Sequence, residues 1–136
     1  MEKPIGSRLN FTDSEEALVS EFMELVQDIL HIDDVQELRD YVQHCKTTRL
    51  QHCVNVAYYT FLISRRLELN VRSATRGALL HDFYLYDWKN NEQPIEGRHS
   101  VVHPQVALAT AKQYTQVDSI MEDCILNHMW PMSRQR

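Results

Sequence analysis

Glycine and proline are scarce in this 136-residue chain, which holds three glycines and four prolines. Both residues are common in turns, so their scarcity argues against a loop-rich or all-β fold. Hydrophobic residues make up 43% and charged residues 24% of the chain, which are ordinary values for a globular domain. The composition therefore predicts an all-α fold, and the length suits one domain with a buried core.

Cysteine is also rare, and its spacing excludes two kinds of small fold. Cys45, Cys53 and Cys124 form no C-x-x-C pair, so neither a zinc knuckle nor a disulfide framework is indicated. Free, mostly buried thiols in a reducing cytoplasm are expected instead. The N-terminal residues carry charges and lack a long apolar run, so we expect no signal peptide, no membrane span and a cytoplasmic location.

Basic residues are outnumbered, with 14 Lys and Arg against 19 Asp and Glu, and the net charge is -5. A protein that binds extended nucleic acid needs a basic face to displace counterions, so this partner is disfavoured. A small phosphorylated substrate such as a nucleotide is still compatible with the charge, because bound metal ions can reverse the local field.

Apolar residues recur at helical spacing through most of the chain, and capping residues mark where helices begin. Thr48 with Gln51 forms a capping box before the clearest helix, and Asn70 can cap the next. Together these signals predict a bundle of about six helices: from Thr12 or Asp13 through Ile29, from Asp33 or Asp34 through Val42, from Thr48 through Ile63, from Asn70 to His81, from Pro104 through Tyr114, and from Ser119 to a stop before Pro131.

Seven histidines are the unusual feature of the composition. His52, His81, His103 and His128 each come from a different predicted helix, at its end or on its core-facing stripe, and Asp82 directly follows His81. Helix bundles build metal sites from inward-pointing ligands on several helices. Imidazole and carboxylate ligands together suit divalent ions such as Fe, Mn, Co, Ni or Zn, and a carboxylate can bridge two of them.

Each histidine taken alone has an ordinary explanation. His52 on a helix stripe can be a hydrogen-bonded core residue, and His103 can be an N-cap before Pro104. His128 can be a cation favoured by a helix C-terminus. The combination of four histidines and a carboxylate is much harder to explain in this way.

Four segments carry a resemblance to a known family: TTRLQHCVNVAYYTFLISRRL, ATRGALLHDFYLYDW, HSVVHPQVALATAKQY and ILNHMWP. They resemble the HD domain superfamily of metal-dependent phosphohydrolases, in particular small bacterial HD proteins with a GALLHD-x-x-LYDW segment. The resemblance runs from Thr47 to Pro131. It implies an all-α fold and hydrolysis of a phosphate mono- or diester, with one or two divalent ions, Mg among them.

The resemblance also assigns roles to individual residues. His52 matches the first metal-ligating histidine, and His81 with Asp82 matches the pair that names the family, Asp82 being the bridging carboxylate. His103 and His128 match the two further histidines of binuclear members, with His99 as a second choice for His103. The resemblance therefore implies that His81 and Asp82 are the catalytic residues.

The family closes its site with an Asp on a further helix, and no Asp follows Asp123 in this sequence. Residues 47–136 are therefore expected to be an HD-type core that lacks the closing Asp helix, with weaker metal binding. Residues 1–46 fall outside the resemblance. Their apolar side chains are expected to pack on the same domain, with a homodimer interface as the alternative.

Substrate contacts are expected from the irregular segment between residues 83 and 97 and its end. Arg98 and Lys89 are the candidates, because a phosphate needs cationic partners. The alternative is that both are solvated surface charges. Trp88 is expected to pack over the site.

The favoured function is metal-dependent hydrolysis of a nucleotide-like phosphate ester. Two alternatives stay open. The first is a non-catalytic HD-like module that binds a nucleotide or a partner through an incomplete metal site. The second is a helical interaction domain whose histidines are incidental.

Overall fold

The computed structural model describes residues 15–44, 46–88, 92 and 94–129. Within these ranges the chain forms six α-helices, one 3-10 helix and a two-stranded antiparallel hairpin, which confirms the predicted all-α class. In chain order the elements are α1 (Glu15–Leu30), α2 (Asp33–Gln36), η1 (Glu37–Asp40), β1 (Val42–His44), β2 (Thr47–Thr48), α3 (Arg49–Arg66), α4 (Val71–Leu80), α5 (His99–Tyr114) and α6 (Ser119–Asn127).

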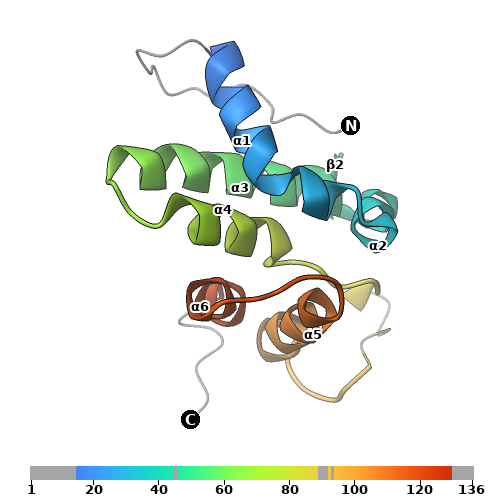
Figure 1. Ribbon diagram of the computed structural model, residues 1–136. Helices are drawn as coiled ribbons and strands as arrows, with labels where there is room; N and C mark the ends of the chain where they lie inside the picture. The colour runs from blue at the N-terminus through green and yellow to red at the C-terminus, as the bar shows by residue number, and fades with distance from the viewer. Residues whose placement is uncertain (1–14, 45, 89–91, 93, 130–136) are drawn as a thin grey trace.

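Helix α4 lies at the centre of the bundle (Figure 1). It packs against α3 on one side and against α6 on the other, while α1 crosses over α3 and also contacts α4. Helix α5 packs beside α6. The end of α4 is therefore the place where residues from α3, α5 and α6 can meet. None of the helices in the described part of the chain is both long and apolar enough to span a membrane.

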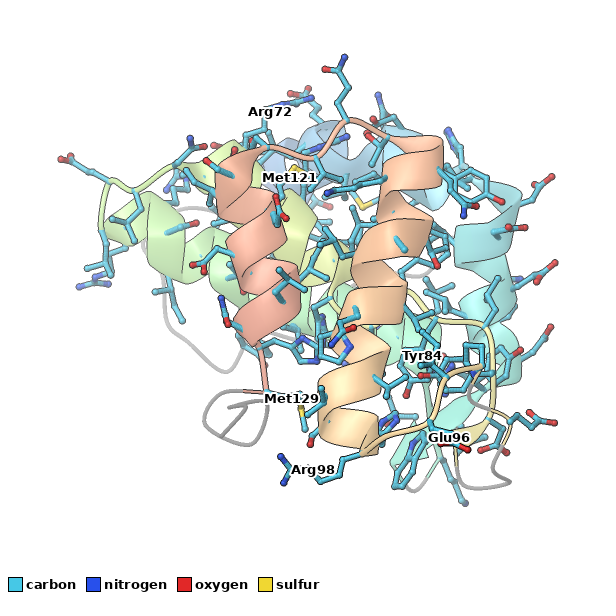
Figure 2. All side chains as sticks on the ribbon, turned by 90° about the horizontal axis from the view of Figure 1, so that it is seen from below. Arg72, Tyr84, Glu96, Arg98, Met121 and Met129 are labelled. Carbon is cyan, nitrogen blue, oxygen red and sulfur yellow. The ribbon has the colours of Figure 1, made fainter. Side chains whose placement is uncertain are left out.

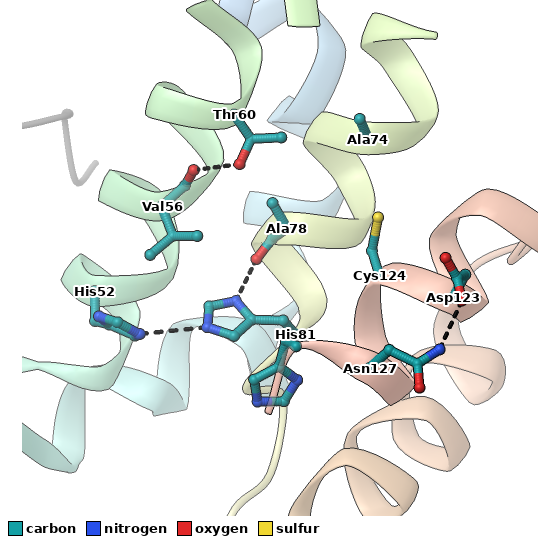
Figure 3. Close-up of a pocket in the computed structure, with 10 residues that line it drawn as sticks. His52, Val56, Thr60, Ala74, Ala78, His81, Asp123, Cys124 and Asn127 are labelled. Atoms are coloured by element: carbon teal, nitrogen blue, oxygen red, sulfur yellow. Dashed lines mark hydrogen bonds between the residues drawn. The ribbon is translucent and has the colours of Figure 1, made fainter. Parts of the chain in front are cut away.

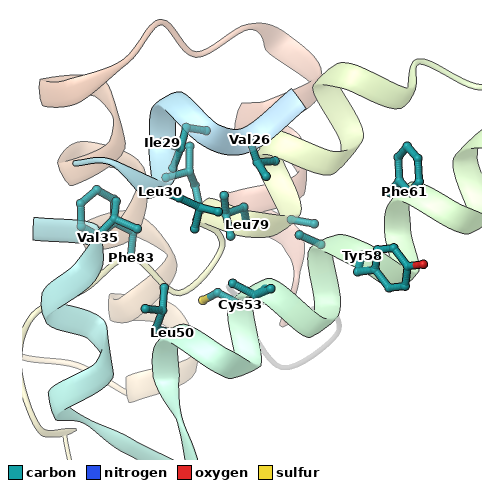
Figure 4. Close-up of a cluster of buried hydrophobic side chains, with 14 of the residues drawn as sticks. Val26, Ile29, Leu30, Val35, Leu50, Cys53, Tyr58, Phe61, Leu79 and Phe83 are labelled. Carbon is teal, nitrogen blue, oxygen red and sulfur yellow. The ribbon is translucent and has the colours of Figure 1, made fainter. Parts of the chain in front are cut away.

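The hydrophobic core joins the N-terminal helix to the rest of the bundle (Figure 4). Val26 and Ile29 of α1 are fully buried in the same cluster as Leu50 of α3 and Leu79 of α4. Phe83, which directly follows Asp82 in the sequence, is buried in the same cluster. We propose from this shared core that the described residues of the segments 1–46 and 47–136 form one domain.

Two predicted helix starts are confirmed by their caps. The Thr48 hydroxyl oxygen accepts a hydrogen bond from the Gln51 backbone N–H at 3.1 Å, and Asn70 Oδ1 accepts one from the Ser73 N–H at 3.1 Å. The predicted cap at Ser119 is wrong by one residue. Asp118 caps α6 instead, and its side chain accepts a hydrogen bond from the Met121 N–H at 2.8 Å.

Two other helix boundaries differ from the prediction. The helix expected to reach Val42 ends in η1, and Val42 lies in β1 with 59% of its surface exposed. Helix α5 begins at His99 rather than at Pro104, which sits inside it. A proline there removes one helical hydrogen bond but leaves the preceding turn intact. That earlier turn lets His99 and His103 lie on one face of the helix.

Gly77 sets the close approach of α4 and α6. A Cβ at this position would lie 3.0 Å from the Met121 Cα and 3.0 Å from the Cys124 Cβ, and both of these atoms are held by the α6 backbone. We expect Gly77→Ala to lower the free energy of unfolding by about 1 kcal/mol, because the overlap outweighs the gain in helix propensity. Chemical denaturation checks this, and an unchanged or raised midpoint would show that α6 can yield.

Candidate metal centre

The five candidate ligands come from four helices, and the structure brings all of them together. His81 caps the C-terminus of α4 and Asp82 follows it, and the two are only 6% and 4% exposed. His52 lies in the first turn of α3, His103 in α5, and His128 at the C-cap of α6.

The Asp82 carboxylate lies at the middle of the cluster. Its Oδ2 is 3.4 Å from His52 Nε2 and 3.3 Å from His81 Nε2. Its Oδ1 is 3.3 Å from both His103 Nε2 and His128 Nε2. The cluster therefore divides into two halves, each with two imidazoles and one oxygen of the shared carboxylate. In each half the three donor atoms lie within 4.8 Å of one another, a spacing that can hold a metal ion.

The hydrogen bonds behind the imidazoles set their tautomers. The Nδ1 atoms of His81, His103 and His128 lie 2.5, 2.6 and 2.7 Å from backbone carbonyl oxygens, which can only accept. The proton of each neutral ring therefore sits on Nδ1, and Nε2 carries a lone pair directed into the cluster.

These lone pairs face one another at short range. His81 Nε2 lies 3.3 Å from His52 Nε2 (Figure 3). His103 Nε2 and His128 Nε2 are 2.8 Å apart. The unprotonated Nε2 atoms of His103 and His128 repel each other at this distance unless a proton or a cation lies between them. The donor set therefore fits a divalent metal ion in each half.

The charge of Asp82 completes this donor set. Burial alone would raise the pKa of its carboxyl group, but the four surrounding histidines, whose Nε2–H groups donate to it when the rings are protonated, hold that pKa far below its usual range. The carboxylate is therefore ionised at neutral pH. An anion enclosed by imidazoles offers one oxygen to each half, as a bridging ligand does.

A protein-family model described as HD domain matches residues 49–135, more than half of the chain. The chain belongs to the HD domain family. All five ligand candidates of this HD domain lie within the matched region, and the predicted resemblance is confirmed.

One curated relative of this HD domain is the Ribonuclease Y of Petrotoga mobilis (strain DSM 10674 / SJ95). It is 34% identical over 71 residues, which are 52% of this chain and 13% of that protein. The chain thus spans a small part of the relative's length, and the similarity concerns one region of it. No solved structure matches the chain.

The segment after the HD pair is held in place by Arg49, a residue that the sequence did not single out. Its guanidinium donates hydrogen bonds to the backbone oxygens of Tyr84, at 2.6 Å, and Tyr86, at 3.1 Å. It also lies over the rings of Tyr41 and Tyr84, 4.4 and 3.7 Å from their centres. Arg49 is only 2% exposed, so these contacts fix the chain just beyond Asp82.

We expect Arg49→Lys to lower the free energy of unfolding by about 2 kcal/mol. A lysine keeps the charge but loses the planar guanidinium that lies over the Tyr41 and Tyr84 rings, and its longer, flexible stem fits the buried position less well. The same change at Arg66, exposed at the other end of α3, is the matched control and is expected to have almost no effect. Chemical denaturation of both variants checks this, and equal midpoints would contradict the anchoring role.

His99 is outside both donor groups, although it was the second choice for a ligand. Its ring stacks between Trp88 and His103, with ring centres 4.2 Å apart on each side. Burial, and then the neighbouring His103, lower the pKa of His99 to about 4, so the ring is uncharged at neutral pH. Trp88 thus packs over the second half of the cluster through His99.

A cavity of about 540 Å³ opens beside the cluster, large enough for a small molecule (Figure 3). Its wall includes His52, His81 and His128, together with residues of α3, α4 and α6 that the sequence did not mark as functional. Arg98, a predicted substrate contact, is exposed at the start of α5 (Figure 2) and does not line this cavity. Lys89, the other candidate, lies outside the described residues.

Proposed function

We propose that this HD domain is a metal-dependent phosphohydrolase that cleaves a phosphate mono- or diester with activated water. The observation that carries the proposal is the pair of facing imidazole sets around one buried carboxylate, a donor set whose spacing can hold an ion in each half. The family supports the same conclusion. Membership in it favours this reaction class and does not indicate a substrate.

The proposed roles follow from the two donor groups. His52, His81 and Asp82 would hold one ion, and Asp82, His103 and His128 would hold a second. When bound, such ions lower the pKa of water and neutralise charge on a phosphate group. Three protein ligands leave positions open for water and substrate in each half. The carbonyl groups behind the rings keep the imidazoles oriented.

The two thiols in the described part of the chain, those of Cys53 and Cys124, do not offer a competing nucleophile. Burial raises the pKa of Cys53 well above its ordinary value. Cys124 lines the cavity, but burial and the nearby Asp123 and Asp118 carboxylates raise its pKa as well. Both thiols therefore stay protonated at neutral pH, and a protonated thiol is a poor nucleophile. This supports attack by water rather than a covalent enzyme intermediate.

Metal analysis followed by a turnover assay tests the proposal. The purified protein is loaded with Mn, Fe, Co, Ni, Zn or Mg and assayed on p-nitrophenyl phosphate and bis(p-nitrophenyl) phosphate, with a chelator as the control. We expect turnover of at least one ester that the chelator removes and excess metal restores. Metal bound without turnover would favour the non-catalytic module. No metal bound at all would favour a helical domain with incidental histidines.

A further inference from the structure

The cavity extends from the metal centre along α3 for about two helical turns (Figure 3). His52, Val56 and Thr60 line it at intervals of four residues, so Thr60 lies about 12 Å from His52 along the helix axis. Ala74 and Ala78 form part of the α4 wall, and their small side chains leave the space open. The cavity thus has room for a group larger than a phosphate.

Apart from the histidines, the polar groups that line the cavity are mostly acceptors. The Thr60 hydroxyl donates to the Val56 carbonyl oxygen at 2.8 Å, and Asn127 Nδ2 donates to Asp123 Oδ1 at 2.6 Å. These bonds use the Thr60 hydroxyl hydrogen and one of the two Asn127 Nδ2 hydrogens, so the cavity is offered three acceptor oxygens, from Asp123, Asn127 and Thr60, and one amide hydrogen. Such a set suits hydroxyl groups, which can donate to it.

Cationic side chains are absent from the described lining of this cavity. A second cavity, of about 340 Å³, differs in this respect, because its lining includes Arg72 and Arg76. There the Arg76 guanidinium is engaged in two hydrogen bonds with the Asp28 carboxylate, at 2.7 and 2.9 Å. The cavity beside the metal centre therefore has an acidic, not a basic, polar end, and Asp123 would repel a second anionic group.

We propose that this cavity receives the alcohol part of a phosphomonoester, and that this part is uncharged and carries several hydroxyl groups, as a sugar or sugar alcohol does. Asp123 is the specificity-determining residue, since its carboxylate accepts hydrogen bonds from hydroxyl groups and rejects a second anion. The inference rests on the proposed function, because the phosphate is taken to lie at the metal centre.

Two matched ligands test the charge selectivity. Sorbitol 6-phosphate and 6-phosphogluconate have the same open chain, but the second bears a carboxylate at the far end. Isothermal titration calorimetry of the Mn²⁺-loaded protein is expected to give a Kd about fivefold to tenfold higher for 6-phosphogluconate. Asp123→Asn is expected to bring the ratio of the two Kd values below about twofold.

Glu122→Gln is the matched control variant. It removes one negative charge from the adjacent position of α6, where Glu122 pairs with Lys112 at 3.7 Å and does not line the cavity. We expect it to keep the ratio of the unmodified protein. A ratio near one in the unmodified protein, or the same ratio in Asp123→Asn, would overturn the role of Asp123.

n-Hexyl phosphate, which has the chain length of sorbitol 6-phosphate without its hydroxyl groups, tests the second part of the inference. We expect its Kd to be about fivefold higher than that of sorbitol 6-phosphate. Equal or tighter binding of n-hexyl phosphate, or no binding of either ester, would overturn the inference. Phosphate release measured on the same samples separates the two proposals: selective binding without release would refute hydrolysis while leaving the cavity's selectivity established.

Discussion

Asp82→Asn is expected to abolish metal binding in both halves of the cluster. The substitution keeps the size of the side chain but removes the negative charge and one oxygen, and Asp82 is the only residue shared by the two donor groups in the described part of the chain. Metal at 100 times its Kd stabilises a folded protein by about 2.7 kcal/mol. For a domain of this size that corresponds to a rise in melting temperature of about 10 °C.

The measurement is thermal unfolding with added Mn²⁺ and with a chelator. The unmodified protein should show the rise and lose it on chelation, while Asp82→Asn should show neither. Asp40→Asn, the same change at an exposed residue of η1, should behave like the unmodified protein. A metal-dependent rise that persists in Asp82→Asn would remove the carboxylate from the centre of the site.

Most of the fold could be predicted because the sequence signals that specify a helix are local. Apolar residues at helical spacing and side-chain caps such as Thr48 and Asn70 depend only on neighbours in sequence. The helix boundaries that were predicted wrongly lie where contacts between residues distant in sequence determine the backbone conformation. Val42 continues an apolar pattern, but the Arg49 N–H donates to the Tyr41 carbonyl oxygen at 2.7 Å, and the chain turns back as a hairpin there.

The metal-ligand candidates could be predicted for a different reason. Histidine is uncommon enough that four of them at helix ends, with an adjacent carboxylate, form a pattern even without a structure. The residues around them carry no such signal. Arg49, Asp123 and Asn127 are ordinary on their own helices, and only tertiary packing places Arg49 against the Tyr84 carbonyl and the other two at the cavity.

The packing of α4 against α6 affects both the fold and the cluster of metal-ligand candidates. Gly77 lets α6 approach α4 closely, and this approach brings His128 from the end of α6 to within reach of Asp82 at the end of α4. The first half of the cluster does not depend on α6, because His52 comes from α3 and both His81 and Asp82 follow directly from α4. The second half therefore depends on the packing of three helices, α4, α5 and α6, whereas the first half depends on two.

His128→Ala is accordingly expected to remove one of two bound ions and leave the other. The first half keeps His52, His81 and Asp82, which are three ligands and enough to hold an ion. The second half keeps only one imidazole and its share of the carboxylate. Because one of two clamping cations is lost, turnover should fall by about 10²–10³-fold.

Metal content measured by mass spectrometry after gel filtration should fall from about two ions per chain to about one. His52→Ala should give the same count by emptying the other half, whereas Asp82→Asn should give none, since both halves use its carboxylate. This order of the three variants follows from the geometry and does not depend on which metal is native. Two ions retained in His128→Ala, or one ion in the unmodified protein, would contradict a centre made of two halves joined through Asp82.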